Sequence, residues 1–319
     1  MKQVEERYIS LLTDFGFKRI FGSAPNKDLL ICFLNSLFNG RQVVKDVKYL
    51  NPEKVGDIYT DRKAIFDVYC EGENGEKFIV EMQNAYQTYF KDRALFYSTF
   101  PIREQAPKGS EWDFKLNHVY TIALLNFNMN EVAFNKEEIR HHVQLCDTAT
   151  HKIFYDKLEF IYVEIAKFNK SLDELDTLYD KWLYALKNLY KLTQRPKALC
   201  DKVFDRLFEE AEIARFTPQE QREYEASKMA YRDIKNSIDT AKREGKEEGL
   251  AEGMEKGLAE GMEKGLAKGM EKGLAEGMEK GMSQRSLEIA RKMLANGMDA
   301  ATVMEITGLS ESQLQQLKG

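Results

Sequence analysis

The chain has 319 residues, 43% of them hydrophobic and 31% charged, with a formal net charge of −5 at pH 7. A chain of this length and composition can bury one large core or two ordinary ones, which excludes a wholly disordered protein. The slightly acidic balance excludes a globally basic coat for nucleic acid, but it is compatible with a local basic cleft.

Hydrophobic periodicity predicts a mixed order of helices and strands. We expect helices over 8–21 and 26–38, strands over 43–50, 64–70 and 77–83, a helix over 88–104, and strands over 118–126 and 160–166. This order predicts an α/β fold with a mixed sheet flanked by helices, followed by an all-helical C-terminal region.

Changes of composition divide the chain into four segments. We expect a core domain over 1–200, a helical extension over 201–243, a glycine-rich repeat over 244–282 and a small helical module over 283–319.

The sequence shows no membrane or disulfide signal. No run approaches the ~18–20 uninterrupted apolar residues of a membrane helix, and charges stand where a signal peptide would be apolar. The four cysteines share no short spacing, so neither a disulfide framework nor a CxxC metal site is predicted. We expect a cytoplasmic protein that does not bind membranes.

The strands over 64–70 and 77–83 each carry an acid, Asp67 and Glu81, and a glycine-containing turn joins them. A two-residue turn would turn the two acids to opposite faces. A three-residue turn with Gly75 in the left-handed region would instead set them directly opposite each other, with Cβ atoms about 5 Å apart.

In the second register the two carboxylates converge. Both then stay ionised only if a cation lies between them, and a hard, oxygen-preferring ion such as Mg²⁺ fits best. The alternative is an ordinary hairpin with one buried, hydrogen-bonded acid and one charge at its edge.

Asp67, followed after thirteen residues by Glu81-Met82-Gln83, resembles the D…ExK core of PD-(D/E)XK nucleases with Gln in place of Lys. Together with the segments 14–22 and 92–97 and the glycine-rich tail, this ordered set resembles the Rpn recombination-promoting nucleases, also described as PD-(D/E)XK transposases. The resemblance implies a restriction-endonuclease-like core and metal-dependent cleavage of DNA, linked to recombination or mobile elements.

Carried over by position, the resemblance makes Asp67 and Glu81 ligands of Mg²⁺, or of Mn²⁺ or Ca²⁺ in its place, with the backbone carbonyl of Met82 as a further ligand. Gln83 takes the place of the usual lysine. Its amide can orient a water molecule or a phosphate oxygen, but it supplies no positive charge.

Asp14 is a candidate third acid, because a helix over 8–21 could deliver its carboxylate to the metal. Alternatively, Thr13 and Asp14 cap a helix that begins near Phe15.

Contact with DNA must come from clustered cations, because Lys+Arg and Asp+Glu both count 17 in residues 1–115. Arg93 could contact a phosphate or make a structural ion pair. The full set of candidate cations is Lys18, Arg19, Arg62, Lys63, Lys91 and Arg93. Aromatic residues nearby could stack on bases, but their helical spacing favours core packing; these are Tyr86, Tyr89, Phe90, Phe96 and Tyr97.

Ten of the 20 glycines stand at every fourth position from Gly245 to Gly281. Because four residues advance about 400° on a helix, no fixed apolar face persists along this repeat. Two interpretations remain: a twisted helix for self-association, in which glycines allow close backbone approach, and a marginal helical linker.

Residues 301–317 have the order of a helix-turn-helix: a helix, a turn at Gly308, a cap at Ser310 and a second helix. The second helix carries Glu311 and no cation before Lys318, which favours a packing or partner module over a DNA reader.

These observations predict a divalent-metal-dependent DNA endonuclease of low sequence specificity, with self-association through its C-terminal helices. The alternative is a catalytically inactive, oligomeric DNA-binding or protein-interaction protein that retains the fold. Gln83 and the neutral charge of residues 1–115 favour this alternative.

Overall fold

The computed structural model describes residues 6–54, 64–106 and 112–318. The helices are α1 (Asp14–Phe21), α2 (Lys27–Phe38), α3 (Phe90–Glu104), α4 (Leu178–Asn188), α5 (Lys202–Ala211), α6 (Pro218–Ala295), α7 (Ala300–Thr307) and α8 (Glu311–Lys318). The strands are β1 (Val47–Tyr49), β2 (Glu53–Lys54), β3 (Ala64–Ile65), β4 (Val68–Gly72), β5 (Lys77–Gln83), β6 (Val119–Leu125), β7 (Arg140–Cys146) and β8 (Ile153–Glu164). The chain forms two compact units, Met1–Thr240 and Ala241–Gly319.

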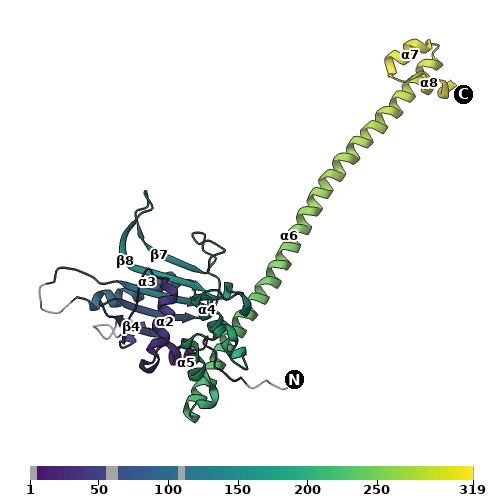
Figure 1. The fold of residues 1–319 in the computed structure, drawn as a ribbon. Helices are drawn as coiled ribbons and strands as arrows, with labels where there is room; N and C mark the ends of the chain where they lie inside the picture. The colour runs from purple at the N-terminus through teal and green to yellow at the C-terminus, as the bar shows by residue number, and fades with distance from the viewer. Residues whose placement is uncertain (1–5, 55–63, 107–111, 319) are drawn as a thin grey trace. The chain divides into compact units, whose positions relative to one another are not determined.

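A six-stranded mixed sheet forms the centre of the first unit, in the order β1-β4-β5-β6-β8-β7 (Figure 1). The inner strands β5, β6 and β8 run parallel, and the remaining pairs are antiparallel. All seven residues of β6 are buried. A continuous apolar run of this kind is typical of a strand that is covered on both faces of a parallel sheet.

Helices cover both faces of this sheet. On one face α1, α2, α4 and α5 share a core with inward side chains of the strands, including Val68, Val80 and Met82. On the other face α3 packs over Phe66, Tyr69 and Ile79 and over the inner strands. Because side chains alternate along β5, Glu81 and Gln83 lie on the α3 face.

The predicted fold class is confirmed, and the differences concern the ends of elements, one broken strand and one strand that was not predicted. The strand over 77–83 has the predicted bounds, whereas the strand over 64–70 is broken into β3 and β4. The helix predicted over 8–21 begins only at Asp14, because the preceding residues run beside the end of α5, where Tyr8 bridges to Glu212 and Ile9 donates to the carbonyl of Ala211. The periodicity did not predict β7, whose apolar positions are few.

In the second unit α6 continues as one helix through the glycine repeat. The Leu and Met residues of the repeat are 63–70% exposed, from Leu250 to Met282. The end of α6 packs with α7 and α8 around a small core that contains Ala290, Val303 and Leu314. The left-handed Gly308 ends α7, and α8 begins at Glu311, directly after Ser310, so the predicted helix, turn, cap and helix are confirmed. Among the described residues, no helix is both long enough and apolar enough to cross a membrane.

Candidate nuclease site

The register of the β4–β5 hairpin brings the two predicted acids together. Val68 pairs with Val80 and Glu71 with Lys77, so the same register sets Asp67, the residue before β4, opposite Glu81. The turn contains three residues: Gly72 donates to the carbonyl of Glu76 at 2.8 Å, and Gly75 has φ +83°. The three-residue turn is confirmed, and the two-residue turn is wrong.

Asp67 lies where the hairpin ladder breaks. Along a strand of an antiparallel pair, the backbone amide and carbonyl of every second residue both point to the partner strand. Glu76 bonds to Gly72 in this way, so Met82, six residues later, also points its amide and carbonyl towards the β4 side. There the amide of Met82 donates to Oδ2 of Asp67 at 2.8 Å, in place of a backbone carbonyl. The side chain of Asp67 keeps 23% exposure. The carboxylate of Asp67 is therefore held on the side of β5 to which the backbone carbonyl of Met82 also points.

Glu81 is buried, and only one of its two carboxylate oxygens accepts a hydrogen bond from the described residues. Its side chain accepts a hydrogen bond from Nε2 of Gln83 at Oε2, 2.9 Å away. Its other oxygen, Oε1, is buried and has no hydrogen-bond partner within the described ranges. Burial, and then the negative charge of Asp67, raise the pKa of Glu81 to about 8. Burial also raises the pKa of Asp67. A buried carboxylate oxygen without a partner is costly, and a bound cation would satisfy it.

Two cations lower the pKa of both acids against the effect of burial: Lys18 of α1 and Arg93 of α3. Nζ of Lys18 lies 2.7 Å from Oδ1 of Asp14 and 4.0 Å from Oδ1 of Asp67. Positive charge therefore reaches the acids from two different elements.

Arg93 is fixed by its surroundings on α3. Its guanidinium lies over the rings of Phe90 and Tyr97, and Nη1 donates to Gln87 at 2.6 Å. Nη2 is buried and has no hydrogen-bond partner among the residues that the structure describes. The guanidinium is thus held in place, with Nη2 lacking a partner among the described residues.

The start of α1 is attached to the end of the site strand. Asn84, which directly follows β5, donates to the carbonyl of Leu12 at 2.7 Å. Thr13 caps α1 by accepting from the amide of Gly16, as the capping alternative predicted. Gly16 fits closely, since a Cβ there would lie 2.1 Å from the carbonyl oxygen of Ser10. Asp14 is then the first residue of α1, with a side chain that is 64% exposed and paired with Lys18.

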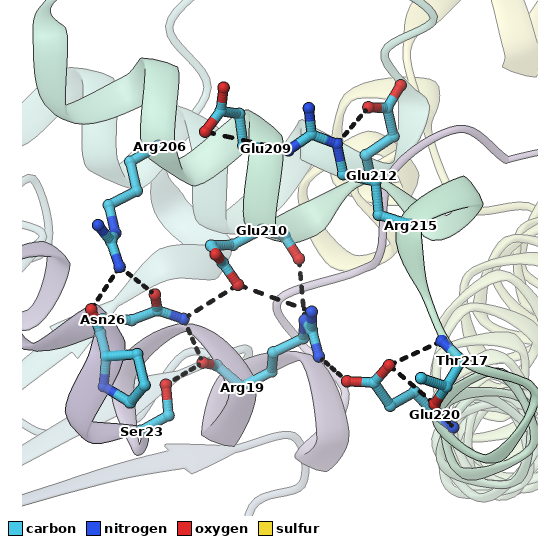
Figure 2. Close-up of polar contacts among 11 residues, drawn as sticks. Arg19, Ser23, Asn26, Arg206, Glu209, Glu210, Glu212, Arg215, Thr217 and Glu220 are labelled. Carbon is cyan, nitrogen blue, oxygen red and sulfur yellow. Dashed lines mark hydrogen bonds and ion pairs between the residues drawn. The ribbon is translucent and has the colours of Figure 1, made fainter.

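Arg19, a predicted DNA contact, is paired with acids of the helices that follow the sheet. Figure 2 shows its guanidinium between Glu210 of α5 and Glu220 of α6, and its carbonyl accepting from Ser23 and Asn26. Arg19 therefore joins α1 to the helices that follow the sheet.

The other predicted contacts vary in their environment. Lys91 is 60% exposed and pairs with Glu131 at 3.0 Å. Arg62 and Lys63 lie outside the described residues. The prediction of core packing holds for Phe90, but it is wrong for the more exposed Tyr86, Tyr89 and Phe96, which are 53%, 75% and 43% exposed. Tyr86 and Tyr89 lie in the segment that leads into α3, and Phe96 lies on α3 itself.

The sequence favoured core packing over base stacking for Tyr97, and Tyr97 does pack against a buried cluster. Nothing in the sequence predicted a role for Asn84. Tyr97 contacts Phe66. Burial raises the pKa of Tyr97, and the negative charge of Glu81 raises it further. The available signal was the spacing of Arg93 and Tyr97, which are neighbours on one helix face. Asn84 carried no signal in the sequence, because its partner is a backbone carbonyl that is distant along the chain.

The residues present fit a divalent ion held by few protein ligands. Within 6–54, 64–106 and 112–318, no three His, Cys, Asp or Glu side chains form a metal cluster. Mg²⁺ is commonly bound through one or two carboxylates while keeping several waters. The pair of Asp67 and Glu81, the unpartnered Oε1 and the adjacent Met82 carbonyl match that pattern.

Comparison with known families gives two matches. A family model described as PD-(D/E)XK nuclease family transposase matches residues 11–241. A second, described as the C-terminal HTH domain of the Rpn/YhgA-like nuclease family, matches residues 283–319. No curated protein and no solved structure matches the chain.

Proposed function

Because the chain belongs to the PD-(D/E)XK nuclease family of transposases and carries an Rpn/YhgA-like C-terminal domain, we propose that it is a divalent-metal-dependent DNA endonuclease. The observation that carries the proposal is the pair of Asp67 and Glu81, set opposite each other by the hairpin register, with Oε1 of Glu81 buried and unpartnered among the described residues.

In this proposal Asp67, Glu81 and the carbonyl of Met82 hold Mg²⁺, or Mn²⁺ or Ca²⁺ in its place. When bound, the ion lowers the pKa of a water molecule and neutralises charge that develops on the scissile phosphate.

The remaining work falls to residues of the chain. Gln83 holds Oε2 of Glu81, so Oε1 would remain free to ligate an ion. The amide of Met82 keeps Asp67 in place. Arg93 offers the unused Nη2 donor to a phosphate oxygen, since its other contacts fix the guanidinium. The sequence also predicts Asp14 as a third acid, but its carboxylate pairs with Lys18 at 2.7 Å.

The substrate is proposed to be DNA with little sequence preference, in recombination or in the movement of mobile elements. The neutral charge of residues 1–115 supports weak, backbone-directed binding, to which exposed Lys91 would contribute. A cytoplasmic location stays a prediction from the sequence.

We further propose that the second unit associates with another copy through the repeat. The exposed Leu and Met side chains recur at every fourth residue, along the i±4 ridge that packs helices at about −50°. The glycines beside them leave open space, because an added Cβ would meet nothing within 4 Å.

The competing proposal is an inactive DNA-binding or interaction protein that keeps the fold. It is favoured by Gln83, which leaves the family position for lysine without a cation.

Cleavage of supercoiled plasmid DNA in Mg²⁺ separates the two proposals. We expect nicking by the wild type and losses of at least about 100-fold for Asp67→Asn and Glu81→Gln. Glu73→Gln is the matched control, since it removes an exposed acid from the same hairpin turn and should cleave normally. Cleavage by both the Asp67→Asn and the Glu81→Gln variants would exclude this site. An inactive wild type would favour the competing proposal.

A further inference from the structure

The site lacks a cation at position 83, although charge develops on phosphate during hydrolysis. A lysine at position 83 would bring a positive charge to the acids from β5 itself, whereas the side-chain amide of Gln83 donates a hydrogen bond to Glu81. If the proposed reaction takes place, another element must supply a mobile positive charge beside Asp67 and Glu81.

Lys18 meets this requirement better than Arg93. Its Nζ lies 4.0 Å from Oδ1 of Asp67, and the side chain is 42% exposed, so a substrate can reach it. Arg93 lies over two rings and donates to Gln87, which restricts its guanidinium to one direction. An ammonium group has three donors on a flexible stem, which suits contact with a moving phosphate oxygen or water.

The position of Lys18 is built into the fold. The bond from Asn84 to Leu12 ties the end of β5 to the chain just before α1, and Thr13 then fixes the start of the helix. Lys18 follows one turn later, where Asp14 holds its ammonium group at 2.7 Å. An acid four residues before a lysine is the favourable order for such a pair on a helix.

We propose that Lys18 is a catalytic residue that supplies the positive charge that Gln83 lacks, and that Asp14 is a positioning residue that holds its ammonium group beside Asp67. The assignment rests on the proposed nuclease function and names the residue that completes the site. Asp14 then acts through Lys18, and its exposed carboxylate is not a ligand of the metal.

The test is plasmid cleavage in Mg²⁺ by the full chain, with rescue from a second position. We expect Lys18→Met to lower the cleavage rate about 100-fold, and Lys18→Arg to lower it less. The double variant with Lys18→Met and Gln83→Lys should recover at least about tenfold, because a lysine at 83 returns the charge from β5. A purely structural role for Lys18 would not allow this rescue.

Lys27→Met is the matched control. Lys27 is 46% exposed and pairs with Asp46, so it resembles Lys18 in exposure and pairing but lies on α2. We expect its variant to cleave at the wild-type rate.

Metal binding gives a readout that does not depend on cleavage. Lys18→Met and Asp14→Asn should bind Mg²⁺ at least as tightly as the wild type, measured as the shift of melting temperature with Mg²⁺. Weaker Mg²⁺ binding by Asp14→Asn would make Asp14 a ligand and overturn its assignment as a positioning residue. If the wild type cleaves and Lys18→Met cleaves equally well, or if Gln83→Lys does not rescue Lys18→Met, the role of Lys18 is overturned while the proposed function stands. An inactive wild type would overturn the proposed function and this inference together.

Discussion

At the scale of single residues, Glu81 is the most perturbed acid of the site. Its side chain is 7% exposed, and burial and the charge of Asp67 raise its pKa to about 8. The folded protein without metal therefore holds a proton on Glu81 at neutral pH. A divalent ion must displace that proton, so metal affinity should rise with pH until Glu81 is ionised.

The same pKa predicts how stability depends on pH. The folded-state pKa lies above the ordinary value of 4.5, so the folded state binds the proton more tightly than the unfolded state between these two values. The contribution of Glu81 to the free energy of unfolding is fully favourable below pH 4.5, the ordinary pKa, and is lost as the pH rises towards 8. Glu81→Gln keeps the shape without the charge, and should raise the free energy of unfolding at pH 8 by at least about 1 kcal/mol.

Urea denaturation at pH 5 and pH 8 without divalent ions checks this prediction. Glu73→Gln, in the exposed turn, should change stability little at either pH. An equal effect of Glu81→Gln at both values would show that Glu81 is ionised throughout.

How far single residues could be predicted depended on where their partners lie. The pairing of Asp67 with Glu81 followed from strand alternation and turn length, both of which are local. The environments of Arg19 and Asn84 could not be predicted, because their partners on α5, on α6 and before α1 are brought together only by the tertiary fold.

At the scale of elements, the hairpin turn sets the geometry of the site. A one-residue change of register would turn one acid to the opposite face of the sheet. Gly75 makes the three-residue turn possible, since it has φ +83° and an added Cβ would lie 2.5 Å from the side-chain nitrogen of Asn117.

Gly75→Ala should therefore destabilise the protein by about 1–2 kcal/mol from backbone strain, with an additional cost for displacing Asn117. Gly40→Ala is the control, because Gly40 has the same φ but open space around it. Urea denaturation should show the larger loss for Gly75→Ala, and plasmid cleavage should fall only for that variant. Equal losses for the two variants would mean that the Asn117 contact contributes nothing.

The elements were predicted best where a short apolar run has a clear boundary. The strand over 77–83 is buried from Phe78 to Met82 and is bounded by the turn, and its predicted ends agree with β5. The break between β3 and β4 had no signal in the sequence, because it arises where the carboxylate of Asp67 replaces a ladder carbonyl. The restriction-endonuclease-like order of elements could thus be predicted, while the irregularity that forms the site could not.

At the scale of the whole molecule, the glycine repeat is the feature furthest from ordinary helix composition. Each glycine in a helix interior costs about 1 kcal/mol relative to alanine, yet α6 is continuous through ten of them. Their presence is explained if the missing side chains permit close approach of a second helix.

Replacing Gly253, Gly261, Gly269 and Gly277 by alanine tests this explanation in the full chain. Circular dichroism should show a helix that melts at higher temperature, because alanine is the better helix former and meets no neighbour. Analytical ultracentrifugation should show weaker self-association, because the added methyl groups hold the partner helix away. Unchanged association alongside a more stable helix would contradict the proposal that glycines form the contact.

The central claim is that Asp67 and Glu81 together bind one divalent ion, and calorimetric titration with Mg²⁺ tests it most directly. At pH 7 the wild type should bind the ion and release close to one proton, measured in two buffers of different ionisation enthalpy, because the pKa of Glu81 is about 8. Asp67→Asn and Glu81→Gln should lose this binding, and Glu73→Gln should keep it. Binding of unchanged affinity by Glu81→Gln, or none by the wild type, would contradict the account.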